Sequence, residues 1–539
     1  MQNSMLANVL AAYLDGIKER EFDLPLATLL RASGFYDIHF THGNVEFGKD
    51  FIAKREENGT IIQYSFQSKA GDISQPDWRN EIMAQMLESL LSGLSHPSFD
   101  RNAPHQTVLV ITGKMLGNAA LGLQDLNTTI QQLYGKRPIL LWDRENLIPS
   151  LETNGLEGVY QATASGFLNY GTFYQIYGKT LEEDISHREI EEHSRQWLDV
   201  SMDSGKRLLC SAIESNIFSQ LCQSRGMTYE AIYSHLTLIR TIMHQMYTAN
   251  NQDDTNQLRE LYFQAISNLK KVLKEYLADA KSLWDNANNN LPSIISSSNR
   301  IIMYSIHCAR IMQVAGCLYF LELEQSERDK IISFLTSFLS KEPGCANIPS
   351  DNYAISLVLP ILSLCSSGHR NIAEQLLHDS TVWLCDRYQD GSGLADISAE
   401  PYKEIVTLFG HPFDFIRVQP RRGSLAASVI CDLAAFVAEA ELYANIVNDI
   451  KAAKIAPQYW QVPDTTSLFI LDGEDIISYP NINYSDDYLP FESFSFADHI
   501  KHEARSFKIT NHTGPFGPLL MMILLRDRYF PTLWPQLSN

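Results

Sequence analysis

The sequence predicts an α/β N-terminal domain, with a mixed central sheet flanked by helices, followed by a larger and mainly α-helical region. Three observations support this. Short β-prone runs alternate with helical patterns over about residues 10–155. Helical periodicity dominates from about residue 179 to 455. The 539 residues, 45% hydrophobic and 20% charged, have a globular composition and exceed one ordinary core.

The clearest element is a β-hairpin around Asn58-Gly59, a dipeptide typical of two-residue hairpin turns. If these two residues form the loop, position 57 faces position 60 and Asp50 faces Gln67. Side chains alternate along a strand, so Gln67 and Lys69 share a face. By the same alternation, Glu46, Gly48 and Asp50 share one face of the preceding strand. The hairpin therefore gathers Glu46, Asp50, Gln67 and Lys69 on one surface.

The remaining elements of this domain follow in a regular order. A helix is expected around Leu29-Leu30, and another from Pro76 to Leu91. Val108 to Ile111 reads as a buried strand that ends at Thr112-Gly113. A helix near 117–134, a strand from Pro138 to Trp142 and a short helix after Asp143 complete the series.

The spacing Asp50–Gln67-x-Lys69, within this order of elements, resembles the catalytic core of the PD-(D/E)xK or restriction-endonuclease-like superfamily. The Gln variant is most similar to its Mrr-type branch. The resemblance covers about residues 10–155 and implies a nuclease fold. It also implies that Asp50 and Gln67 hold Mg²⁺ or Mn²⁺, and that Lys69 assists the attacking water.

These residue types suit phosphodiester hydrolysis. A hard divalent ion with oxygen ligands lowers the pKa of its water and offsets charge on the reacting phosphate. Asp50 supplies an anionic ligand, whereas Gln67 offers only a neutral carbonyl oxygen. The site therefore has one negative charge fewer than its acidic counterpart, so we expect weaker metal binding unless Glu46 or an upstream acid compensates.

The resemblance also points to supporting residues. Asp23 occupies the position of the family's first-helix acid, with Glu21 close by, and Gln85 lies on the helix after the hairpin. Each has a plainer interpretation. Glu21 and Asp23 favour a helix N-terminus electrostatically, Gln85 suits a helix surface, and Glu46 suits an exposed strand.

The rest of the chain divides into three segments that differ in composition. Residues 156–178 form a Gly- and aromatic-rich connector, 179–455 a helical regulatory or oligomerisation domain, and 456–539 a Pro-rich segment with a terminal apolar helix. A long helix is expected from after Ser424 to about Lys454. The apolar segment Leu519 to Leu525 packs into its own core or docks to a partner subunit.

Other polar groups in this region suggest no second catalytic site. His187 and His193 flank an acidic helix and are expected on a solvated face. His499 and His502 lack a third metal ligand in view. The eight cysteines form no CxxC pair, and most of them are expected to be reduced and buried. A basic cluster can bind phosphate or merely balance an acidic surface; it comprises Arg417, Arg421 and Arg422.

The net charge and the absence of targeting signals in the sequence limit the class of protein and its expected location. The net charge of −20 argues against a basic DNA-coating protein, although a local basic groove stays compatible with it. The N-terminus lacks a charged region followed by an apolar stretch, and the longest apolar run is Pro518 to Leu525. We therefore expect a cytoplasmic protein without a membrane segment.

The sequence thus predicts a Mg²⁺-dependent endonuclease acting on nucleic acid, with double-stranded DNA as the favoured substrate. The resemblance implies a role in bacterial antiphage defence, with the helical region restraining the nuclease and joining a second copy or a partner protein. The alternatives are a non-cutting nucleic-acid-binding or scaffold subunit and a structure-specific repair nuclease. The preference for DNA over RNA stays open.

Overall fold

The computed structural model describes most of the chain, and every structural statement below refers to that part. It comprises residues 5–41, 48–92, 96–100, 103–164, 170–249, 252–291, 300–391, 393–395, 423–437, 440–457, 469, 509–526 and 529–537. The chain forms two compact units. One consists of Met1–Gly171 with Asp199–Glu214, and the other of Thr172–Leu198 with Ser215–Asn539.

The first unit is an α/β fold, as predicted. Its elements, in chain order, are α1 (Met5–Gly16), η1 (Glu19–Phe22), α2 (Asp23–Ala32), β1 (Tyr36–Phe40), β2 (Phe51–Glu57), β3 (Thr60–Lys69), α3 (Gln75–Asp77), η2 (Trp78–Ile82), α4 (Met83–Leu91), β4 (His105–Ile111), α5 (Asn118–Thr129), η3 (Ile130–Tyr134), β5 (Leu140–Trp142), α6 (Arg144–Asn154) and α7 (Leu156–Ala164).

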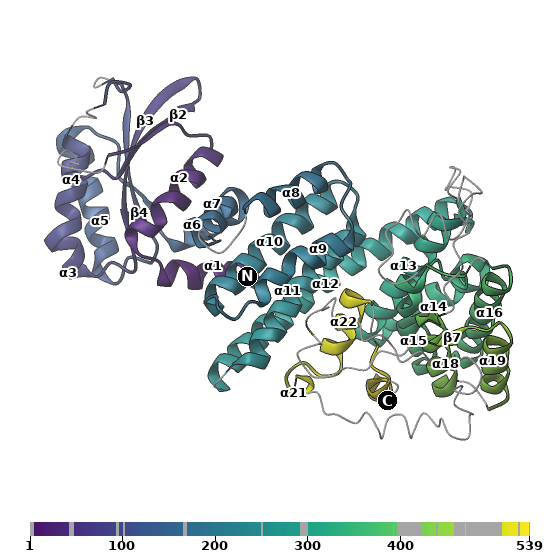
Figure 1. Cartoon of the computed structure of the whole chain (residues 1–539). Helices are drawn as coiled ribbons and strands as arrows, with labels where there is room; N and C mark the ends of the chain where they lie inside the picture. The colour runs from purple at the N-terminus through teal and green to yellow at the C-terminus, as the bar shows by residue number, and fades with distance from the viewer. Residues whose placement is uncertain are drawn as a thin grey trace. The chain divides into compact units, whose positions relative to one another are not determined.

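The five strands lie in the order β1-β2-β3-β4-β5. The first three pair antiparallel, whereas β3–β4 and β4–β5 pair parallel, so the sheet is mixed. Helices cover both faces, with α3, α4 and α5 on one side and α2 on the other (Figure 1). Asp143 caps α6 by accepting hydrogen bonds from the amides of Glu145 and Asn146.

Two apolar layers hold the sheet between these helices. On one face, Leu109 and Ile111 of β4 pack with residues of η2, α4 and α5, including Trp78 and Met86. On the other face Phe66 of β3 packs in an aromatic cluster with Phe35, Tyr64 and Trp142. These layers fix which face of β3 each side chain takes.

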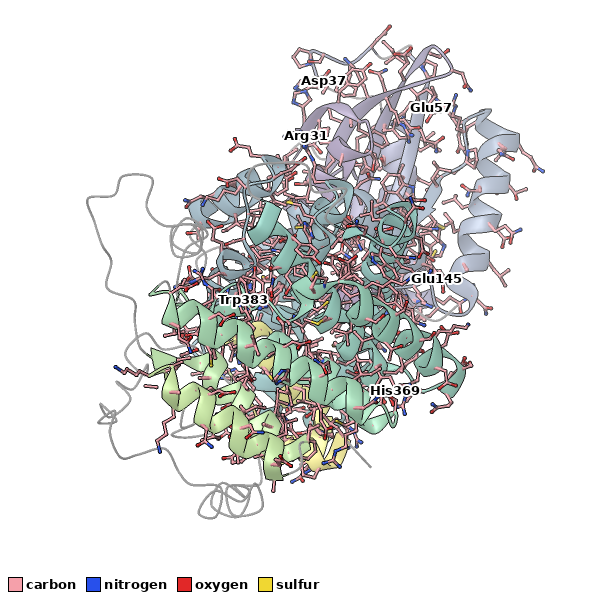
Figure 2. All side chains as sticks on the ribbon, turned by 90° about the vertical axis from the view of Figure 1, so that its right-hand side faces the viewer. Arg31, Asp37, Glu57, Glu145, His369 and Trp383 are labelled. Carbon is pink, nitrogen blue, oxygen red and sulfur yellow. The ribbon has the colours of Figure 1, made fainter. Side chains whose placement is uncertain are left out.

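The hairpin end of the sheet is polar. The hydroxyl of Tyr64 donates a hydrogen bond to Glu57 Oε1 at the turn end of β2, and Asp37 lies on the neighbouring strand (Figure 2). Lys54 Nζ lies 2.7 Å from Asp37 Oδ2, so the carboxylate is paired across the two strands. Hydrogen bonding to Lys54 is the main cause that lowers the pKa of Asp37.

The second unit is mainly helical. Its elements, including those that begin in the first unit, are α8 (Tyr170–Leu181), α9 (His187–Ser194), η4 (Arg195–Leu198), α10 (Ser204–Ser224), α11 (Thr228–Thr248), α12 (Gln252–Asn286), α13 (Arg300–Leu321), α14 (Gln325–Lys341), η6 (Pro343–Cys345), η7 (Asp351–Leu357), α15 (Val358–Ser366), α16 (Arg370–Gln389), β6 (Gly423–Ser424), α18 (Leu425–Val437), α19 (Ala440–Ala452), β7 (Ala456–Pro457), α21 (Thr510–Thr513), α22 (Phe516–Leu525), η9 (Pro531–Leu533) and α23 (Trp534–Leu537).

The prediction of one long helix from after Ser424 to about Lys454 was wrong. Leu425–Val437 and Ala440–Ala452 form separate helices that pack against each other. Both carry apolar residues at helical spacing, and the packing of their two apolar faces explains why periodicity alone did not reveal the break.

The apolar terminal helix packs into its own unit, which decides between the two alternatives. All residues from Leu519 to Leu525 are buried, and α22 lies against α11 and η7. Arg526 ends the helix and is only 3% exposed. Its guanidinium donates to neutral acceptors that include the hydroxyls of Tyr229 and Tyr233 and the carbonyl of Asn352.

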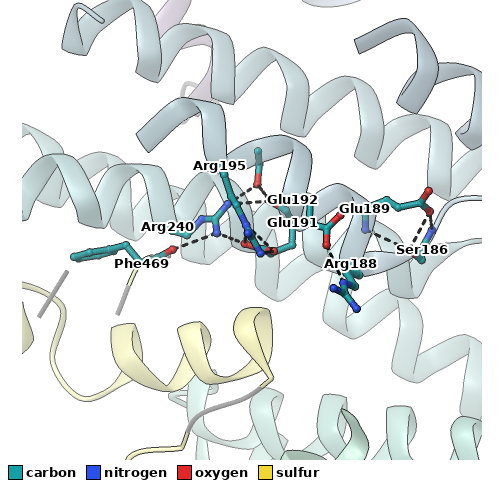
Figure 3. A network of polar contacts seen from close by, with 9 residues as sticks. Ser186, Arg188, Glu189, Glu191, Glu192, Arg195, Arg240 and Phe469 are labelled. Atoms are coloured by element: carbon teal, nitrogen blue, oxygen red, sulfur yellow. Dashed lines mark hydrogen bonds and ion pairs between the residues drawn. The ribbon is translucent and has the colours of Figure 1, made fainter. Parts of the chain in front are cut away.

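The solvated-face prediction for the acidic helix at His187 and His193 was wrong. His193 is 7% and Glu191 only 3% exposed. Glu191 lies between Arg195 and the fully buried Arg240 (Figure 3). A helix with many charges can bury one of them when a cation on the neighbouring helix pairs with it.

Local hydrogen bonds account for other polar groups of this unit. Trp383 donates from its ring nitrogen to the carbonyl of Ile348 at 3.0 Å, and His369 Nδ1 lies 3.1 Å from Ser367 Oγ (Figure 2). The eight cysteines are free thiols and seven are buried, which confirms that prediction. The arginines at 417, 421 and 422 and the histidines at 499 and 502 lie outside the described residues.

Candidate active site

The hairpin has the predicted register. Phe51 pairs with Phe66, and the pairing continues without a bulge to Glu57 and Thr60. Asn58 and Gly59 both take positive φ, 51° and 78°, as a type I′ turn requires. Paired positions from Phe51 to Glu57 therefore follow the predicted sum. The register ends at Phe51, because the amide of Asp50 donates to the carbonyl of Phe66 and the predicted pairing of Asp50 with Gln67 is not part of the ladder.

Backbone contacts hold Asp50 beside β3. Its amide donates to the carbonyl of Phe66 at 2.8 Å, and its Oδ2 accepts from the amide of Ser68 at 2.7 Å. The residue is 8% exposed. The carboxylate is thus anchored to the backbone of β3 at Ser68, the residue after Gln67.

Gln67 presents an unsatisfied oxygen. The residue is 5% exposed, and its Oε1 is buried with no hydrogen-bond partner among the described residues. Leaving a buried acceptor unpaired costs about 1–3 kcal/mol. A cation at this oxygen would offset that cost, which is the property expected of a metal ligand.

Lys69 ends β3 between two acids that the sequence reasoning missed. Its Nζ lies 3.4 Å from Oε1 of Glu81 and 3.6 Å from Oε1 of Glu19. The Lys69 side chain is 16% exposed, whereas those of Glu81 and Glu19 are 62% and 42% exposed. The spacing of four residues between Glu81 and Gln85 indicated that these two side chains are neighbours, but nothing in the sequence indicated the contact with Lys69.

The helix after the hairpin lies directly against the chain that enters β2. Gly48 has φ +62°, and a Cβ placed there would lie 2.2 Å from the backbone oxygen of Gln85. Gln85 Nε2 donates to Glu81 Oε1 at 3.3 Å, and Gln85 Oε1 is buried without a partner in the described part of the chain. Gln85 is thus partly buried rather than fully exposed, and its role in the site stays a prediction.

The upstream acids differ in their surroundings. Glu21 Oε2 accepts from the amide of Lys18 at 3.1 Å, so it caps η1, as the plainer interpretation expected. Asp23 is the first residue of α2 and is half-buried, and its role as a metal ligand stays a prediction. Glu46 lies outside the described residues.

Two buried titratable groups lie beside the hairpin: Lys49 directly precedes Asp50, and His105 begins β4, where it pairs with Gln63 of β3. Lys49 is 4% exposed, and burial lowers its pKa to about 8 against a rise from the nearby Glu88. Burial likewise lowers the pKa of His105 to about 4, helped by Lys49. His105 Nε2 lies 2.9 Å from Ser65 Oγ, so the neutral ring has a hydroxyl partner.

The donor set fits a hard divalent cation. Asp50 offers a carboxylate, and the unpartnered Gln67 oxygen adds a neutral ligand, both of them oxygen atoms as Mg²⁺ and Mn²⁺ prefer. Across the described residues, no group of three or more His, Cys, Asp or Glu side chains is arranged to hold a metal. Such an ion would therefore keep several of its waters, which is usual for Mg²⁺.

Comparisons with protein-family models, curated proteins and solved structures find no match to this chain. None of the helices in its described part is long and apolar enough to cross a bilayer.

Proposed function

We propose that this protein is a metal-dependent endonuclease that hydrolyses phosphodiester bonds of nucleic acid, with double-stranded DNA as the favoured substrate. One observation carries the proposal. The amide of Ser68 anchors the Asp50 carboxylate directly after Gln67 in β3, and Gln67 has a buried side-chain oxygen without a partner in the described residues, two positions before Lys69.

Each residue has a defined part in the proposed reaction. Asp50 and Gln67 would hold Mg²⁺ or Mn²⁺, which would supply an acidified water and offset charge on the phosphate. The anchored Asp50 keeps its oxygen in place without reorganisation. Lys69 reaches the same end of β3, where its ammonium can orient the water and stabilise developing negative charge.

The helical unit fits the role of a restraint. The chain carries a net charge of −20, which disfavours contact with nucleic acid away from the site. We propose that the nuclease serves antiphage defence and that a partner or second copy acting on the helical unit releases it. A test compares cleavage by the full chain with cleavage by residues 1–214, which include the whole of the first unit; equal rates would contradict restraint.

The direct test is plasmid cleavage. Supercoiled DNA is incubated with the full chain in Mg²⁺ or in EDTA, beside the variants Asp50→Asn and Lys69→Ala. Glu56→Gln is the matched control, because Glu56 is an exposed acid of β2. We expect Mg²⁺-dependent nicking by wild type and by the control, with at least a hundredfold loss in both site variants.

Two outcomes would contradict the proposal. Equal nicking by all proteins would indicate another site or a contaminant. Binding of DNA by wild type without any cleavage in Mg²⁺ or Mn²⁺ would instead favour the non-cutting interaction subunit.

A further inference from the structure

The helix opposite β3 carries two distinct stripes. Trp78, Ile82, Met86 and Leu90 recur every fourth residue and are buried in the apolar layer. A second stripe, equally spaced, is polar and comprises Glu81, Gln85 and Ser89. The turn between α3 and α4 is a π-helix, Trp78–Ile82, a form that is rare and often found at functional sites.

The polar stripe runs along β3 in the opposite direction. At one end Glu81 Oε1 lies 3.4 Å from Lys69 Nζ, and at the other Ser89 Oγ lies 3.0 Å from Ser65 Oγ. Four helical residues rise about 6 Å and two strand residues about 6.6 Å, so the two spacings match. Gln85 is midway between Glu81 and Ser89, and Gln67 is midway between Lys69 and Ser65. These two residues are therefore expected at the same level between the helix and β3.

We infer that Glu81 is a positioning residue for Lys69. This inference rests on the proposed nuclease function and adds a residue to it. A lysine side chain carries a compact charge on a flexible four-carbon stem. Its ammonium therefore needs a partner to stay in one position. Glu81 Oε1 accepts hydrogen bonds from Lys69 Nζ at 3.4 Å and from Gln85 Nε2 at 3.3 Å. It therefore connects the Lys69 ammonium to the helix that faces β3.

Two features favour Glu81 over Glu19 for this role. Glu19 lies 3.6 Å from Lys69 Nζ, beyond hydrogen-bond distance, whereas the Glu81 contact is a hydrogen bond. The π-helical turn that carries Glu81 is also fixed from behind. A Cβ at Gly122 of α5 would lie 2.6 Å from Trp78 Nε1, so Trp78 is seated tightly on that helix.

The Glu81–Lys69 ion pair contributes little to the stability of the fold but can affect the rate of catalysis. Glu81 is 62% exposed, and ion pairs of this kind stabilise proteins only weakly. A misplaced catalytic group costs far more in rate, on the order of a hundredfold for a shift of about 1 Å. The role of Glu81 should therefore appear in kinetics while the stability of the protein stays unchanged.

The experiment measures steady-state cleavage of plasmid by the full chain, as wild type, Glu81→Gln, Glu81→Asp and Glu19→Gln, with Glu56→Gln as control. We expect Glu81→Gln to lower kcat on the order of tenfold. KM for DNA and the Mg²⁺ concentration for half-maximal rate should stay unchanged. Glu81→Asp should recover part of the rate, and Glu19→Gln should lose less than Glu81→Gln.

A second background separates positioning from a general structural effect. In Lys69→Ala protein, Glu81→Gln should cause no further loss, because the group that it positions is gone. An equal loss in both backgrounds would overturn the inference, as would wild-type or faster kcat in Glu81→Gln. A wild-type chain that does not cleave overturns the nuclease proposal and this inference together; a cleaving chain with an inert Glu81 overturns the inference alone.

Discussion

Gly48 offers the most direct check on how the hairpin and α4 are joined. Alanine at this position would keep φ near +62° only at a cost, because a left-handed conformation costs an L-residue about 1–2 kcal/mol. Its methyl group would also lie 2.2 Å from the backbone oxygen of Gln85. A backbone atom cannot rotate away as a side chain can, so α4 or the chain at Gly48 must move.

Gly59 is the matched control. It also has a positive φ, +78°, but a Cβ there meets nothing within 4 Å. Gly59→Ala should therefore cost only the conformational part, about 1–2 kcal/mol of unfolding free energy. Gly48→Ala should cost that amount plus roughly 1–3 kcal/mol for overpacking, so about 2–5 kcal/mol in total.

The assay is native-state hydrogen exchange on peptides from β2 and from Met83–Leu91, with urea titration to place both variants on one scale. Gly48→Ala should lower protection in both segments, whereas Gly59→Ala should affect the hairpin and leave α4 at its wild-type protection. Equal protection of α4 in the two variants would refute the close contact between Gly48 and Gln85.

Three further predictions follow from individual contacts. Gln67→Glu adds the missing carboxylate, so Mn²⁺ should bind on the order of tenfold more tightly by calorimetric titration; unchanged affinity would remove Gln67 from the metal site. Burial lowers the pKa of His105 from 6.5 to about 4, so the unfolded chain binds a proton that the folded chain does not. Stability should then fall as pH drops from 6.5 to 4, and His105→Gln should reduce that loss by roughly 3 kcal/mol in acid denaturation. Glu191→Gln leaves Arg240 buried without a carboxylate and should cost about 3–5 kcal/mol in thermal unfolding, whereas the exposed Glu192→Gln should cost less than about 1 kcal/mol.

The local pattern of the first unit was predictable because short-range signals determine it. Asn58-Gly59 requires two positive φ values, and only one register satisfies both that turn and the buried face of β3. Strand β4 was equally clear, since a continuous apolar run fits a strand covered on both faces. The positions of Gln67 and Lys69 on β3 followed from that register, whereas the contact of Asp50 with the amide of Ser68 did not.

Residues that act across elements were not predictable in this way. Glu81 reaches Lys69 through a π-helical turn, which no periodicity in the sequence indicates. Glu191 lies in a strongly charged segment, and only the fold reveals that Arg240 meets it from another helix. The division between α18 and α19 was missed for the same reason, because their packing is tertiary.

The most direct measurement is an anomalous diffraction map of crystals grown with Mn²⁺. Coordination by both Asp50 and Gln67 predicts one peak, with each side-chain oxygen at about 2.1 Å. A peak elsewhere in the first unit, or none while the protein cleaves DNA in Mn²⁺, would contradict the assignment of these two residues as the metal ligands.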